Sequence, residues 1–155
     1  MNLIGALKSY SNDNNLLIGI CLGMQLLLSK SYEFGENEGL DLIPGEVKPF
    51  DKIYNKEGSL LYPIPQIQWN KVNFVSNKSN IFDIDFDNEL YMYFINSFYC
   101  ELKSKDHLIA SSSYANIEYP SIIKHDNIVG FQFHPEKSGL LGLNFYNWIK
   151  WQINL

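Results

Sequence analysis

The chain has 155 residues, of which 46% are hydrophobic and 19% charged, and its formal net charge is −5. This length and composition predict one globular domain with a buried core, and the negative charge argues against a nucleic-acid partner. The longest apolar stretch surrounds Cys21 and is shorter than the roughly 20 residues that a membrane span needs, so we expect no transmembrane segment.

The first 32 residues predict a helix, a buried strand and a second helix. Residues 1–10 have apolar side chains at positions 3, 4 and 7, which predicts an amphipathic helix that ends in the polar segment that follows. Residues 16–20 form a continuous apolar run, typical of a strand buried on both faces of a parallel sheet. Residues 22–32 have the length and the helix-forming side chains of a second helix. This order favours a doubly wound α/β domain with a mostly parallel sheet.

The rest of the chain predicts several strands and a closing helix. β-branched and aromatic runs separated by turn residues indicate strands in succession, at 45–50, 71–76, 90–100 and 107–114. Residues 127–136 predict a strand that runs into a turn. The last segment, 139–155, predicts a helix packed on the sheet, because four large apolar side chains recur at helical spacing: Leu141, Phe145, Trp148 and Ile149.

Two cysteines and the absence of arginine limit the chemistry of the chain. Cys21 and Cys100 could pair, but a core of this size needs no disulfide, and the first residues do not resemble a secretory signal. We therefore expect free thiols and a reducing, cytoplasmic location. Because no arginine is present, a ligand's carboxylate or phosphate would have to be held by backbone amides or by lysine.

Gly19-Ile20-Cys21-Leu22-Gly23 is the thiol counterpart of the nucleophile elbow, and it lies at the predicted strand-to-helix junction. The glycines would let the strand and helix approach closely enough to hold Cys21 in strained backbone geometry. The thiol would then project at the carboxyl end of the strand, where the helix amides lower its pKa and the Leu22 amide donates to a developing oxyanion. The alternative is a small buried hydrophobic residue, and the spacing alone favours neither interpretation.

A thiol nucleophile needs a base, and three histidines are available. His107 and His125 lie in polar contexts typical of solvated loops. His134 ends an apolar alternation, and Glu136 follows two residues later. On an extended segment these two side chains share a face, so Glu136 can hold one ring nitrogen while the other faces Cys21. The alternative is a strand-end histidine beside a solvated glutamate, but together with the elbow the pattern favours a catalytic triad.

Five segments together resemble the class I glutamine amidotransferases, most closely the glutaminase subunits of imidazole glycerol phosphate synthases in histidine biosynthesis: GICLGMQLL, GLDLIPGEV, IPQIQWNKV, YFINSFY and GFQFHPEKSGLLGL. The resemblance covers essentially the whole chain and implies one glutamine amidotransferase domain over residues 1–155 with a flavodoxin-like sheet. It implies that Cys21 attacks the side-chain amide of glutamine, that His134 moves the protons and that Glu136 orients His134.

The resemblance also implies ligands and a partner. Gly23 and Gln25 match positions that line the glutamine site, and the backbone of Ser97 and Phe98 matches the segment that holds the α-amino and carboxylate groups. The ammonia released would pass to a (β/α)8-barrel synthase (cyclase) subunit in a heterodimer, without cofactor or metal.

Trp69 and Asn70 match the region of the family that faces the synthase, and the alternative is an ordinary turn capped by an aromatic side chain. Two residues nearby depart from the family pattern, since Asn96 replaces a usual histidine and Gln68 a usual glycine. Family members also carry two earlier strands and a P-G-x-G-x-F loop that supplies oxyanion amides, so we expect the domain to be N-terminally incomplete.

Other functions stay open on the sequence alone. A paralogous amidotransferase that feeds ammonia into surface-sugar biosynthesis has much the same motifs. An inactive truncated remnant and a stand-alone cysteine hydrolase of similar fold are two further alternatives. Metal binding by Cys21, Cys100 and His134 is disfavoured because the sequence shows no paired ligand spacing.

Overall fold

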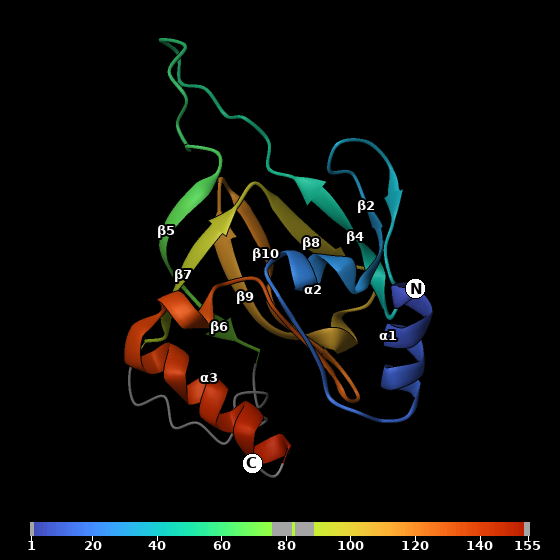
Figure 1. Ribbon diagram of the computed structural model, residues 1–155. Helices are drawn as coiled ribbons and strands as arrows, with labels where there is room; N and C mark the ends of the chain where they lie inside the picture. Colours follow the sequence, from blue (N-terminus) through green and yellow to red (C-terminus); the bar gives the residue numbers. More distant parts are fainter. Residues whose placement is uncertain (1, 76–81, 83–88, 154–155) are drawn as a thin grey trace.

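The computed structural model describes residues 2–75, 82 and 89–153 (Figure 1). In chain order the elements are α1 (Leu3–Asn12), β1 (Leu17–Ile20), α2 (Leu22–Leu26), β2 (Leu28–Ser31), β3 (Asn37–Glu38), β4 (Ile43–Pro49), β5 (Gln66–Lys71), β6 (Asn73–Phe74), β7 (Tyr91–Asn96), β8 (Phe98–Leu102), η2 (Lys105–His107), β9 (Leu108–Tyr114), β10 (Ile117–His125), β11 (Ile128–Phe131), η3 (Pro135–Lys137) and α3 (Gly139–Gln152). Four residues that the sequence assigned to elements lie outside the described part: Met1, Ser76, Asn154 and Leu155.

The described strands form three sheets. The largest has the order β1-β11-β10-β9-β6, a second has the order β3-β2-β4-β8, and β5 pairs with β7. The pairs β1–β11 and β2–β4 are parallel, whereas the other described pairs are antiparallel. The α/β class holds, but the sheets are mixed and not mostly parallel as expected.

A tight turn explains why β9 and β10 are antiparallel. Strands β9 and β10 are joined by Ala115 and Asn116, whose φ angles are 49° and 62°. Positive φ at both central residues is characteristic of the type I′ turn, whose twist matches that of an antiparallel hairpin. A parallel connection needs a crossover of about a dozen residues or more, and the chain between β8 and β11 has no such segment.

The expected helix over 22–32 is wrong beyond residue 26, because α2 ends at Leu26 and β2 begins at Leu28. The carbonyl of Leu27 accepts hydrogen bonds from the amides of Leu42 and Ile43, and the carbonyl of Leu28 accepts one from Asp41. These distant partners take the carbonyls that a longer helix would use. Good local helix propensity is therefore overridden by pairing with β4.

The closing helix packs on the sheet as predicted. Phe145 is fully buried, and its ring lies 5.2 Å and 5.4 Å from those of Phe131 and Phe133, centroid to centroid. Trp148 is also buried, whereas Leu141 stays 38% exposed. Figure 1 shows α3 (red) and α1 (dark blue) on either side of the strands that include β1 and β11. No helix in the described ranges is long and apolar enough to cross a bilayer.

Candidate functional site

Cys21 occupies a sharp turn between β1 and α2. Its φ and ψ are 50° and −107°, a conformation that non-glycine residues rarely adopt. Its amide donates to the carbonyl of Phe131 at 2.7 Å, which continues the β1–β11 ladder to the cysteine itself. The ladder thus fixes the turn, and the thiol lies at the carboxyl end of a parallel strand, where open α/β sheets bind ligands.

The two glycines of the motif differ in their surroundings. A Cβ on Gly19 would lie 2.5 Å from the backbone carbon and oxygen of Gly23, so the turn requires glycine at position 19. A Cβ on Gly23 would meet nothing within 4 Å. The expected need for glycine therefore holds at position 19 and is wrong at position 23, where the space is open.

Gly19→Ala should destabilise the chain by about 3 kcal/mol, because the added methyl group collides with backbone that cannot move aside easily. Gly23→Ala is the matched control, and it should change the free energy of unfolding by less than about 1 kcal/mol. Urea unfolding measures both. Equal losses in the two variants would contradict the close approach of β1 and α2.

The thiol of Cys21 is free and contacts two groups from distant segments. Its Sγ donates to the carbonyl of Ile95 at 3.6 Å, and the side-chain amide of Gln132 donates to Sγ at 3.8 Å. Cys100 is also free and is fully buried. Cys21 is thus the thiol that remains partly accessible.

The expected lowering of the Cys21 pKa is wrong for this structure. Burial raises the pKa of the Cys21 thiol above its ordinary value, and it outweighs the backbone amide of Leu22, which lowers it. The carboxylates of Glu136 and Glu33 add to the increase, whereas the Gln132 amide opposes it. The helix amide acts in the predicted direction, but one amide does not compensate for the loss of water around the sulfur.

The raised pKa predicts the pH dependence of thiol reactivity. Only the thiolate reacts with iodoacetamide, so alkylation of Cys21 should keep accelerating as the pH rises through and above about 8.5. Peptide mass spectrometry separates Cys21 from Cys100. A rate that levels off below pH 8 would show that charge stabilisation, and not burial, dominates at Cys21.

His134 and Glu136 form the predicted pair. The Nδ1 atom of His134 lies 2.6 Å from Oε1 of Glu136, and the His134 side chain is 20% exposed. The segment around His134 is hydrogen-bonded to β7, because the His134 amide donates to the carbonyl of Tyr93 at 2.9 Å. The Ser138 hydroxyl donates to the His134 carbonyl at 2.7 Å and accepts from the Tyr93 amide at 3.0 Å. The pairing occupies Nδ1, so Nε2 is the ring nitrogen that can act as a base.

Strand β7 brings the thiol and the histidine to one edge. Sγ of Cys21 lies at the carbonyl of Ile95, and the backbone of His134 lies at the carbonyl of Tyr93. Carbonyls two residues apart on a strand point the same way and are about 7 Å apart. The other two histidines pack against each other, 4.6 Å between ring centroids, on η2 and β10.

Two of the predicted substrate residues, Ser97 and Phe98, directly follow β7, and a third, Gln25 of α2, bonds to Phe98. Ser97 separates β7 from β8, and its carbonyl accepts from the Phe50 amide at 3.1 Å. The Phe98 carbonyl accepts from the side chains of Gln25 at 3.2 Å and Asn96 at 3.0 Å. Gln25 is buried and bonded within the protein, so in this structure its amide is directed at protein atoms.

The predicted partner residues lie on β5, which pairs with β7. Trp69 is 51% exposed, shares its face with the exposed Ile67, and contacts the ring of Tyr93 edge to face at 6.0 Å. Asn70 differs, because its side chain donates to the Ser113 carbonyl and accepts from the Lys71 amide. Trp69 therefore offers an accessible surface, whereas Asn70 is bonded within the chain.

Sequence reasoning missed two residues of the site, Gln132 and Ser138. Gln132, His134 and Glu136 are each two residues apart, so the alternation that we expected for His134 and Glu136 pointed to Gln132 as well. The extended segment on which that expectation rested is wrong, because Glu136 lies in the 3-10 helix η3 and meets His134 across a turn. Ser138 gave no comparable signal. Its role depends on Tyr93, which is 45 residues away.

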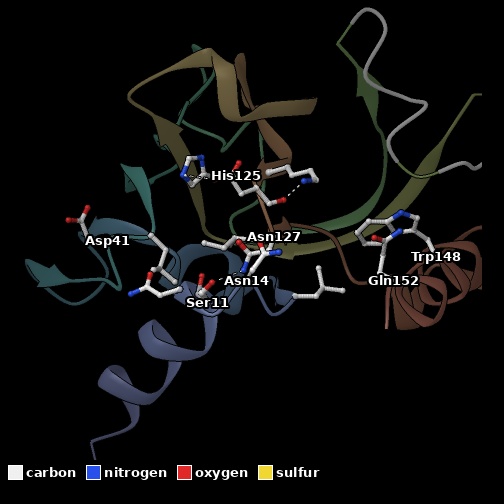
Figure 2. A pocket seen from close by; sticks show the side chains of 13 residues that line it. Ser11, Asn14, Asp41, His125, Asn127, Trp148 and Gln152 are labelled. Carbon is white, nitrogen blue, oxygen red and sulfur yellow. Dashed lines mark hydrogen bonds and ion pairs between the residues drawn. The ribbon is translucent and has the colours of Figure 1, made fainter. Parts of the chain in front are cut away.

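A large cavity lies away from these residues. It has a volume of about 840 Å³, and its lining includes Ser11, Leu16, Asn127, Ile128 and Trp148. Figure 2 shows the lining side chains that come from α1, from the turn before β11 and from α3. Because β1 and β11 are parallel, this cavity lies at their amino ends, whereas Cys21 and His134 follow their carboxyl ends.

Comparison with known proteins places the chain among amidotransferases. Residues 1–142 match the family "Glutamine amidotransferase class-I". Relatives named imidazole glycerol phosphate synthase subunit HisH include those of Wolinella succinogenes, 43% identical over 89% of this chain and 64% of the relative, and Chlorobium chlorochromatii, 41% identical over 92% and 67%. The HisH of Carboxydothermus hydrogenoformans is 42% identical over 88% of this chain and 63% of the relative. The chain thus spans about two thirds of the length of these proteins.

Solved structures agree on the fold. A glutamine amidotransferase from Thermotoga maritima matches with a TM-score of 0.60 and 17% identity, over 97% of this chain and 54% of the other. The structure of PurLQS from the same organism matches with a TM-score of 0.66 and 14% identity, over 97% and 68%. The predicted amidotransferase fold is confirmed, and the chain belongs to the class I glutamine amidotransferase family.

Proposed function

We propose that the chain is the glutaminase subunit of imidazole glycerol phosphate synthase, which hydrolyses glutamine to glutamate and ammonia. The observation that carries the proposal is a thiol in a strained turn whose sulfur contacts the same strand edge that holds the paired His134 and Glu136. The similarity to HisH proteins, 36–43% identity over most of the chain, supports the choice within the family.

Cys21, His134 and Glu136 divide the chemistry between them. His134 takes the thiol proton as Sγ turns from the Ile95 carbonyl and bonds to the side-chain amide carbon of glutamine. The Leu22 amide stabilises the oxyanion of the tetrahedral intermediate. His134 then returns the proton to the amide nitrogen, the C–N bond breaks, and ammonia leaves a thioester. His134 next deprotonates a water molecule, whose oxygen attacks the thioester, so that the C–S bond breaks and glutamate and the thiol are released. Glu136 stabilises the imidazolium in both steps.

The position of β7 supports a proposal for the substrate side and the partner side of the chain. The segment at Ser97 and Phe98 begins two residues beyond Ile95, whose carbonyl contacts Sγ. We propose that the backbone of this segment holds the α-amino and carboxylate groups of glutamine while the side-chain amide reaches Sγ. We propose that the exposed face of β5, with Trp69 and Ile67, contacts a (β/α)8-barrel cyclase subunit that consumes the ammonia.

Glutamate release from glutamine tests the proposal, measured with and without the cyclase subunit of the same organism. Glutamate should form with the complex, faster than with the chain alone, and the shorter amide asparagine should give little product, because its amide carbon falls short of Sγ by one methylene. A folded complex that releases no glutamate from glutamine would overturn the proposed function.

A further inference from the structure

Gln132 is a buried glutamine whose amide orientation is determined by its neighbours. Gln25 donates from Nε2 to the Phe98 carbonyl, a backbone acceptor that cannot exchange roles. The same nitrogen donates to Oε1 of Gln132 at 3.3 Å, so the oxygen of the Gln132 amide faces Gln25. Its Nε2 therefore faces Sγ of Cys21, at 3.8 Å. The Gln132 side chain thus presents an N–H, not a carbonyl, to the sulfur.

Both ends of Gln132 are held in place. Its backbone amide donates to the Ser121 carbonyl at 2.9 Å, and the side chain has no exposed surface. Gln25 is also buried, at 8% exposure. A continuous series of contacts therefore runs from the sulfur of Cys21 through two glutamine amides to the Phe98 carbonyl, in the segment proposed to hold the substrate's backbone groups.

We propose that Gln132 is a positioning residue for the thiol, which holds the sulfur beside the substrate segment and stabilises the thiolate once His134 has taken the proton. This inference rests on the proposed function and names a residue that acts through Cys21. An N–H donor strengthens its bond when the sulfur becomes charged, whereas burial opposes the charge. The hydrogen bond from Gln25 to Oε1 of Gln132 keeps the Gln132 amide in the orientation in which its N–H faces the sulfur.

Two variants separate positioning from a purely structural role. Gln132→Met keeps the length and apolar bulk of the side chain but removes the donor. Gln132→Glu keeps the shape and places a carboxylate beside the sulfur, which disfavours the thiolate more strongly. Gln152→Met, at the exposed end of α3, is the matched control for loss of a glutamine amide. If Gln132 had a structural role alone, both variants would have a lower melting temperature, but the pKa of the Cys21 thiol would not be higher in Gln132→Glu than in Gln132→Met.

The test is the pH midpoint of Cys21 alkylation by iodoacetamide, followed on the Cys21 peptide by mass spectrometry. The midpoint should rise by about half to one pH unit in Gln132→Met, by more in Gln132→Glu, and not at all in Gln152→Met. An unchanged midpoint in folded Gln132→Met would overturn the proposal. Since this readout needs no glutamine, it is independent of whether the chain proves to be a glutaminase.

A second measurement uses the unmodified chain, so that it does not depend on the folding of a variant. The side-chain amide resonances of Gln132, followed by ¹⁵N nuclear magnetic resonance, should titrate with the midpoint found for Cys21 alkylation. Those of Gln152 should not respond. A Gln132 amide that is insensitive to thiol ionisation would also overturn the proposal.

Discussion

Cys21→Ala is expected to lower glutamate release from glutamine by about a thousandfold or more, in the complex with the cyclase subunit. In the proposed mechanism the sulfur bonds to the substrate, and removal of a nucleophile from a cooperating triad costs nearly the whole contribution of the triad. Partner binding should persist, because the proposed contact surface is the exposed face of β5, which does not include Cys21. Glutamate assays and size-exclusion chromatography measure the two properties.

Cys100→Ala is the matched control for Cys21→Ala. Cys100 lies in the core cluster beside Val47, with no exposed surface, so its loss should affect stability slightly and glutamate release hardly at all. If Cys21→Ala retained the activity of the parent complex, the thioester route would be excluded. Equal loss in both variants would indicate damage to the fold and not to the chemistry.

His134→Ala is expected to reduce glutamate release by a comparable factor, about a thousandfold or more. Without the imidazole the thiol loses its proposed base, and the raised pKa of Cys21 leaves little thiolate at neutral pH. Glu136→Gln should cause a smaller loss, since Glu136 is 44% exposed and water replaces part of its interaction with Nδ1.

His125→Ala controls for loss of an imidazole elsewhere on the chain. His125 packs on His107 and lines the cavity at the amino ends of β1 and β11, so glutamate release should stay within about twofold of the parent. Activity in His134→Ala close to that of His125→Ala would mean that another group serves as the base.

Local patterns predicted the parts of the fold that depend on local chemistry. The apolar run before Cys21 is β1, but among the described strands β1 lies at the edge of its sheet and only Gly19 in it is buried, so it is not a strand buried on both faces as expected. The helical spacing of Phe145 and Trp148 marks α3, and the turn at Cys21 is the predicted strand-to-helix junction. The His134–Glu136 contact was also predictable, because two residues of one short segment need no distant partner to meet.

Non-local pairing explains what the sequence did not show. Leu27 and Leu28 favour a helix by propensity, but their carbonyls bond to segments near β4, and β2 forms instead. The thiol pKa depends on how much protein surrounds the sulfur, which a motif does not encode. Cys21 and His134 are brought to the same strand edge by β7, through the carbonyls of Ile95 and Tyr93. These carbonyls lie far along the chain from both residues, so the motifs around Cys21 and His134 do not reveal the contacts.

The most direct measurement is the position at which a glutamine analogue with a diazoketone in place of its side-chain amide reacts with the chain in its complex. A thiolate in a glutamine site should displace nitrogen and form a thioether. Peptide mass spectrometry should find one adduct, on Cys21 and not on Cys100, which excess glutamine prevents. An unlabelled Cys21, or labelling that glutamine does not suppress, would contradict its assignment as the nucleophile.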